Sequence, residues 1–128
     1  MTHPATVAIV DDDTRLLESL RELLESVGFN VVTYPSGRQL VRSDAFALMD
    51  CLITDIGMPG LDGFELERLV RERRPEVPVF LITGRHELAE RRAAQDDESR
   101  PIFRKPFDGK ALLAAIGEAL AKSDGNLP

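Results

Sequence analysis

Five short apolar segments, separated by amphipathic stretches, run along the chain. Each segment is almost continuously apolar, which is typical of strands covered on both faces, as in a parallel sheet between two layers of helices. We therefore predict five strands, over residues 7–10, 31–34, 51–54, 79–83 and 102–103.

A helical pattern follows the first apolar segment. Leucines recur there at three- and four-residue steps, and the pattern continues to Val27. Asp13 or Thr14 is placed to cap the N-terminus of this helix, and Gly28 is placed to end it. The spacing predicts one amphipathic helix with its leucines toward the core.

The remaining helices are predicted from caps and breakers. A second helix is expected to start after Ser36 and to continue through Phe46, a third ends at Pro75, and the last begins at Asp108. Residues 84–100 have few apolar side chains, so we expect a polar, mobile helix there.

Strands that alternate with helices predict βαβ crossovers and one parallel sheet with helices on both faces. With 128 residues, the chain is too short for a TIM barrel and falls in the one-domain range. We expect a doubly wound α/β domain over residues 1–122, followed by a frayed tail over 123–128.

Composition narrows the function classes. The formal net charge of -6 disfavours direct binding to nucleic acid or to an anionic membrane. One cysteine and two histidines exclude an internal disulfide and a Cys/His zinc site, and Cys51 is expected to be a small core residue. The absence of a long apolar run or an export signal favours a soluble, cytoplasmic protein.

Polar side chains stand at the ends of four predicted strands. Three aspartates, Asp11–Asp13, end the first strand, and Asp55, Thr83 and Lys105 end the third, fourth and fifth. Carboxyl ends of parallel strands meet at one edge of a sheet. Carboxylates that share a site need a proton or a cation, and oxygen ligands with solvent access favour Mg²⁺. The set therefore predicts magnesium-dependent phosphoryl transfer, with Thr83 as a donor and Lys105 as a positive charge.

A simpler interpretation is that the first aspartates only cap a helix and that Asp55 only opens a turn. Capping explains Asp13 or Thr14. It does not explain a further acid at the end of a neighbouring strand together with Lys105 at another.

Four segments together resemble the receiver domain of bacterial two-component response regulators. They are Val10–Asp12, Thr54–Gly63, Leu81–Gly84 and Lys105–Phe107. The resemblance covers essentially the whole chain. It implies a CheY-like, flavodoxin-like three-layer sandwich with the strand order 2-1-3-4-5.

The resemblance implies that Asp55 accepts a phosphoryl group from the phosphohistidine of a histidine kinase or a phosphotransfer protein. Asp12 would bind Mg²⁺ directly and Asp11 through water, with Asp55 and the backbone carbonyl of Gly57 as further ligands. The domain would catalyse only its own phosphorylation and dephosphorylation, so it is a signalling module and not a turnover enzyme.

In the family, the residues equivalent to Thr83 and Lys105 contact the phosphoryl group and transmit its charge. The usual aromatic switch position is Ile102 here, which is a departure. The family docks an output protein, or a second copy, on the face formed by the fourth helix, fifth strand and last helix. Ile102, Arg104 and Leu113 would lie there.

Two other classes are considered. Asp11–Asp13 resembles the D-x-D-x-T/V signature of haloacid-dehalogenase-like phosphatases, in which Asp11 would be the nucleophile, but Arg15 occupies the Thr/Val position. A flavodoxin-like cofactor binder would need a phosphate loop and aromatic rings for stacking. The chain has no such loop, a single tyrosine, Tyr34, and no tryptophan.

Overall fold

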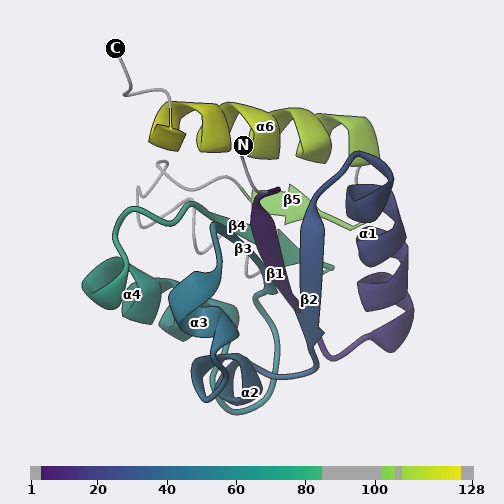
Figure 1. Ribbon diagram of the computed structural model, residues 1–128. Coiled ribbons are helices and arrows are strands. Elements are labelled where there is room, and N and C mark those ends of the chain that lie inside the picture. The colour runs from purple at the N-terminus through teal and green to yellow at the C-terminus, as the bar shows by residue number, and fades with distance from the viewer. Residues whose placement is uncertain (1–3, 85–101, 106–107, 125–128) are drawn as a thin grey trace.

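The computed structural model describes residues 4–84, 102–105 and 108–124. Five parallel strands form one sheet in the order β2-β1-β3-β4-β5 (Figure 1). Their bounds are β1 (Thr6–Val10), β2 (Asn30–Tyr34), β3 (Cys51–Asp55), β4 (Val79–Thr83) and β5 (Ile102–Arg104). The predicted strands, the parallel sheet and the order 2-1-3-4-5 are confirmed.

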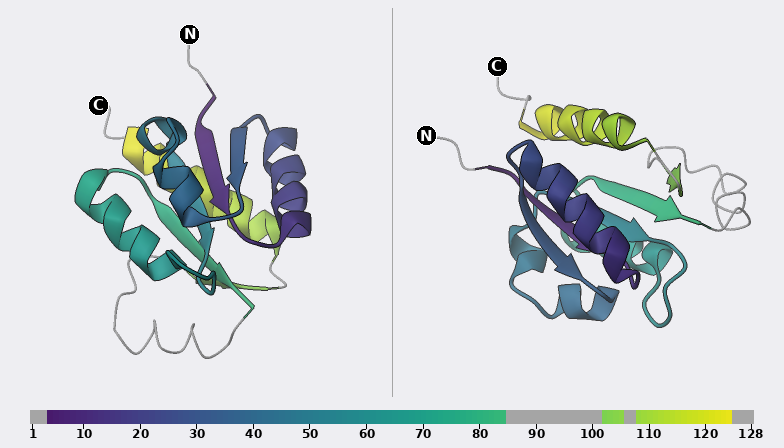
Figure 2. Two further views of the ribbon diagram at one scale, coloured as in Figure 1. Left: turned by 90° about the horizontal axis from the view of Figure 1, so that it is seen from below. Right: turned by 90° about the vertical axis from the view of Figure 1, so that its right-hand side faces the viewer.

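Helices cover both faces of the sheet (Figures 1 and 2). Their bounds are α1 (Thr14–Ser26), α2 (Gly37–Val41), α3 (Ala45–Leu48), α4 (Gly63–Arg73) and α6 (Gly109–Asp124). Helices α1 and α6 lie on one face, and α2, α3 and α4 lie on the other. Residues 85–101, where a polar and mobile helix was expected, lie outside the described part of the chain.

The sheet separates two apolar clusters because successive strand residues point to opposite faces. Val7 and Ile9 of β1 pack in the cluster under α1 and α6, whereas Ala8 and Val10 pack in the cluster under α2, α3 and α4. Every residue of β3 and β4 is buried. The continuous apolar runs of these strands therefore reflect burial on both faces.

Helix α1 begins and ends at the predicted residues. The Asp13 side chain caps its N-terminus by accepting hydrogen bonds from the backbone N–H groups of Arg15 and Leu16, at 3.0 and 3.4 Å. Gly28, with φ +100°, follows the last turn in the left-handed region that glycine adopts readily. This cap fixes the path of the chain just after Asp11 and Asp12.

The single helix predicted from Ser36 through Phe46 is wrong, because the structure forms two short helices there, α2 and α3. Ser36 does cap α2. The break lies at Ser43, whose backbone N–H and hydroxyl both donate to the Leu40 carbonyl, at 3.0 and 2.7 Å. That carbonyl would bond the N–H of Asp44 in a continuous helix, so the serine replaces the helical bond.

Helix α6 is longer than predicted. It extends to Asp124, so the frayed tail does not begin at Ser123, and residues 125–128 lie outside the described residues. Asp108 stands at its start and accepts a hydrogen bond from the Lys110 N–H at 2.9 Å. Among the residues that the structure describes, none of the helices combines the length and the apolar character of a membrane span.

Arg74 joins the end of α4 to the corner between α3 and β3. Its Nη1 donates to the carbonyls of Phe46 and Met49, both at 3.0 Å, and its Nη2 pairs with Glu76 at 2.9 Å. One main-chain acceptor within α3 and one just after it thereby accept from a charged donor, which forms a strong hydrogen bond.

The start of α4 lies directly against the end of β3. A Cβ atom on Gly63 would lie 2.4 Å from the carbonyl oxygen of Asp55 and 2.8 Å from the Cα of Ile56. The Gly63 N–H also donates to the Ile56 carbonyl at 3.1 Å. Only glycine allows this approach without moving backbone.

We expect Gly63→Ala to lower the free energy of unfolding by about 1–3 kcal/mol, because the new methyl group overlaps main-chain atoms. The matched control is Gly117→Ala in α6, where nothing lies within 4 Å of the added Cβ. That variant should gain roughly 0.5–1 kcal/mol from helix propensity. Urea unfolding of both variants measures the difference, and equal effects would show that the close approach is unimportant.

Candidate functional site

Three carboxylates meet at the carboxyl edge of the sheet. Asp11 and Asp12 directly follow β1, and Asp55 is the last residue of β3, the strand beside β1. Asp11 and Asp55 are buried, with 0% and 7% of their surface exposed, whereas Asp12 is exposed. Each offers a carboxylate oxygen, and these oxygens lie within 4.8 Å of one another. The carboxylate group is thus buried at Asp11 and Asp55 and reaches solvent at Asp12.

Lys105, just beyond β5, supplies a positive charge to this group. Its Nζ lies 3.0 Å from Asp11 Oδ2 and 3.4 Å from Asp55 Oδ1. The other oxygen of Asp11, Oδ1, accepts a hydrogen bond from the Asp13 N–H at 2.9 Å. Both oxygens of Asp11 are therefore engaged, which makes Asp11 a poor nucleophile and counts against the phosphatase alternative.

Burial decides the ionisation of the two inner acids. Removal from water raises the pKa of Asp11 and of Asp55 above the ordinary value, and their bonds to Lys105 only partly offset that rise. For Lys105, burial lowers the pKa, but hydrogen bonds and attraction to the two carboxylates outweigh it, and the net pKa is raised. When Asp11, Asp12 and Asp55 are all ionised, their three negative charges exceed the single positive charge of Lys105.

The remaining predicted residues lie at the same edge. Thr83 ends β4, is 1% exposed, and its carbonyl accepts the Lys105 N–H at 2.8 Å. Gly57 is half-buried and follows Asp55 by two residues. Asp13 belongs to the helix cap instead, so the capping interpretation holds for this one aspartate and fails for Asp11 and Asp12.

Two features near Asp55 escaped the sequence analysis. Asp62 and Glu65 form a reciprocal capping box at the start of α4, and the D-x-x-E spacing could have revealed it. The hydroxyl of Thr54 donates to the carbonyl of Asp55 at 3.1 Å. No periodicity or motif in the sequence indicates that contact.

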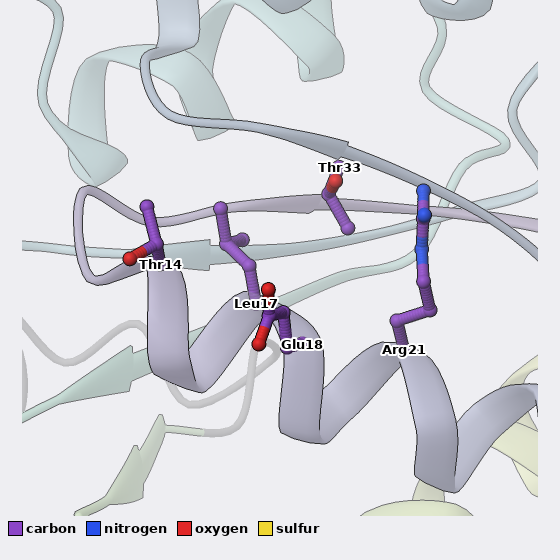
Figure 3. Close-up of a pocket in the computed structure, with 5 residues that line it drawn as sticks. All are labelled: Thr14, Leu17, Glu18, Arg21 and Thr33. Atoms are coloured by element: carbon purple, nitrogen blue, oxygen red, sulfur yellow. The ribbon is translucent and has the colours of Figure 1, made fainter.

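Two hollows flank α1. One, of about 320 Å³, lies beside the site and is lined by Asp13, Leu16, Ser19, Leu20, Leu23, Lys105 and Gly109. The other, of about 220 Å³, lies between α1 and the edge strand β2, and Thr14, Leu17, Glu18, Arg21 and Thr33 line it (Figure 3). None of the three clustered carboxylates lines the second hollow.

The fold and the site define a doubly wound α/β domain with an acidic, oxygen-rich centre at the carboxyl ends of its strands. Residues 7–117 match the family model of the response regulator receiver domain. The chain belongs to this family, as the four sequence segments indicated.

Curated relatives in the family are longer than this chain. It is 35% identical to the C4-dicarboxylate transport transcriptional regulatory protein DctD of Pseudomonas aeruginosa, over 89% of this chain and 25% of that protein. It is 32% identical to the response regulator MprA of Mycolicibacterium vanbaalenii, over 94% of this chain and 52% of that protein. The chain thus spans about half or less of their lengths.

Solved structures of receiver domains have the same fold as this chain. A response regulator receiver domain protein of Clostridium thermocellum has a TM-score of 0.81 at 27% identity, covering 96% of this chain and 99% of that one. The BeF3-activated DrrB receiver domain has a TM-score of 0.80 at 26% identity, covering 91% of this chain and 97% of that one.

The raised pKa of Asp55 predicts a pH-dependent gain in stability for Asp55→Asn in metal-free buffer. An acid whose pKa is higher in the folded state destabilises that state once it ionises, so stability falls as pH rises from the ordinary value of 3.8 through the raised value. The advantage of Asp55→Asn should grow over this window and then level off.

Chemical denaturation of wild type and variant across that pH range measures the effect. Asp44→Asn is the control, because Asp44 is exposed at the start of α3 and its side chain caps no helix. A difference between Asp55→Asn and wild type that stays constant with pH would contradict the prediction.

Proposed function

We propose that Asp55 accepts a phosphoryl group from the phosphohistidine of a histidine kinase or phosphotransfer protein, in a reaction that requires Mg²⁺. The observation that carries this proposal is the set of contacts around Asp55. A nucleophilic carboxylate ends β3, two further carboxylates lie within 4.8 Å, and an ammonium group lies 3.4 Å away. Membership of the receiver family supports the same reaction.

In the proposed step, a carboxylate oxygen of Asp55 attacks phosphorus while the bond from phosphorus to the donor imidazole nitrogen breaks. The imidazole leaves with that electron pair, and the product on Asp55 is an acyl phosphate. Lys105 is placed to pair with phosphoryl oxygens, and Thr83 to donate a hydrogen bond to them. Later attack by water would release phosphate. In this proposal the domain catalyses only its own phosphorylation and dephosphorylation.

The donor set fits a magnesium ion. Asp11, Asp12 and Asp55 offer hard oxygen ligands, and Gly57 would add its backbone carbonyl. When bound, Mg²⁺ would neutralise charge on the transferring oxygens. The raised pKa values of Asp11 and Asp55 support this assignment, because both acids gain from added positive charge.

We further propose that phosphorylation alters the edge formed by β4 and β5 and so changes binding to an output protein or a second copy of the chain. Thr83 and Lys105 are joined through main-chain atoms, and Ile102 pairs with Leu81 in the same two strands. In the part of the chain that the structure describes, the proposed docking face is formed by β5 and α6, which carry Ile102 and Leu113. We also place the receiver in the cytoplasm, where the free thiol of Cys51 suits a reducing environment.

Intact-mass measurement after incubation with Mg²⁺ and acetyl phosphate tests the phosphoacceptor. We expect one added phosphoryl group on wild type and on the control Asp44→Asn, and none on Asp55→Asn or without metal. The carboxamide at position 55 cannot act as the nucleophile. A phosphoryl group that still appears on Asp55→Asn would overturn the assignment.

A thermal-unfolding titration tests the metal site separately. Mg²⁺ at 100 times its Kd should stabilise wild type by about 2.7 kcal/mol, a rise in Tm of roughly 10 °C for a small domain. Asp12→Asn should need more Mg²⁺ for the same rise, because Asp12 is an exposed member of the carboxylate group. Equal titrations for Asp12→Asn and Asp44→Asn would contradict the proposed ligand set.

A further inference from the structure

One buried polar group has no part in the proposed chemistry, namely the hydroxyl of Thr54. Thr54 lies inside β3 and is 0% exposed. Its neighbours across the sheet are Val10 of β1 and Leu81 of β4. Both, with Leu52 two residues earlier on the same face of β3, belong to the apolar cluster under α2, α3 and α4. The hydroxyl therefore lies among hydrocarbon side chains.

A hydroxyl in such a place needs a partner, since leaving a buried polar group without a hydrogen bond destabilises the folded state. Thr54 donates to the carbonyl oxygen of Asp55 at 3.1 Å. A valine would fill nearly the same volume with no polar group to satisfy. What threonine adds at this position is thus a hydrogen bond to the main chain of the phosphoacceptor.

The same carbonyl is approached by α4. The Cα of Gly63 lies so close that an added Cβ would be 2.4 Å from the Asp55 oxygen. On the next residue, the Ile56 N–H donates to the Ile82 carbonyl of β4 at 3.0 Å. The peptide group between Asp55 and Ile56 is therefore held by a side chain of β3, by the first residue of α4 and by the adjacent strand.

We infer that Thr54 is a positioning residue for Asp55. By holding the Asp55–Ile56 peptide group, its hydroxyl sets the direction in which the Asp55 carboxylate leaves the backbone and the path of the chain to Gly57. Displacement of a reacting group by about 1 Å costs up to 10²-fold in rate. The inference rests on the proposed phosphorylation of Asp55 and adds a residue that touches neither metal nor phosphoryl group.

The test compares Thr54→Val, which removes the donor and keeps the shape, with Thr54→Ser, which keeps the donor. Thr33→Val is the matched control, because it makes the same chemical change on the edge strand β2, two strands away from β3. For each protein we would measure the phosphorylation rate by acetyl phosphate at saturating Mg²⁺, the half-saturating donor concentration and the midpoint of urea unfolding.

We expect the maximal rate of Thr54→Val to fall about 5- to 10-fold, which is within the range that misplacement produces. Its half-saturating donor concentration should stay close to that of wild type, and its unfolding midpoint should fall only by the small amount that the loss of one hydrogen bond accounts for. Thr54→Ser and Thr33→Val should phosphorylate within about twofold of wild type. Rescue by serine separates a role of the hydroxyl from a role of side-chain shape.

Four results would overturn the inference. A wild-type rate in Thr54→Val would do so while leaving Asp55 as the phosphoacceptor. A slow Thr54→Ser, or a rate loss in Thr54→Val accompanied by a fall in the unfolding midpoint much larger than one hydrogen bond accounts for, would assign Thr54 to packing alone. A wild-type protein that gains no phosphoryl group would remove the proposed function and this inference together.

Discussion

The ammonium group of Lys105 lies between two carboxylates that have little contact with water, and the carboxyl edge of the sheet is organised around that ion pair. Parallel strands bring Asp11 and Asp55 side by side, and burial makes their ionisation costly. Lys105 reduces that cost only because β5 lies at the far side of β4, with its backbone bonded to Thr83. Sheet order and charge balance thus depend on each other.

This balance also distinguishes the acids from one another. Asp11 uses one oxygen for the turn into α1 and the other for Lys105, so it serves as a fixed anion. Asp12 faces solvent and is free of that constraint within the part of the chain that is described. Asp55 combines burial with a strand-end position. Three identical side chains therefore have different roles because their surroundings differ.

Much of the fold follows from the sequence because its determinants are local or periodic. Continuous apolar runs identified β3 and β4, which are buried on both faces, and Asp13 with Gly28 marked the limits of α1. The membership of the site followed from parallel topology, which brings strand ends together. The break at Ser43 did not follow, because a serine within an apolar pattern indicates neither a continued helix nor a side chain bonded back to Leu40.

The close contacts around Asp55 could not be predicted from the sequence either, because they depend on packing between elements. The approach of Gly63 to the Asp55 carbonyl depends on how α4 packs on the sheet, and a motif containing several glycines does not say which one lies against backbone. The bond from Thr54 is equally invisible, since threonine is a common strand residue. Residue type and spacing predict which elements meet, whereas distances between their atoms come only from the packed structure.

Helix α4 is attached at both ends. Its first residue, Gly63, lies against the end of β3, and Arg74, just after its last residue, bonds the carbonyls of Phe46 and Met49. One inserted residue would turn everything after it by about 100° and lengthen the helix by about 1.5 Å. Arg74 would then point away from its acceptors while Gly63 stayed in place. The length of α4 is thus matched to the distance and angle between its two attachment points, and an inserted residue would break one of the two attachments.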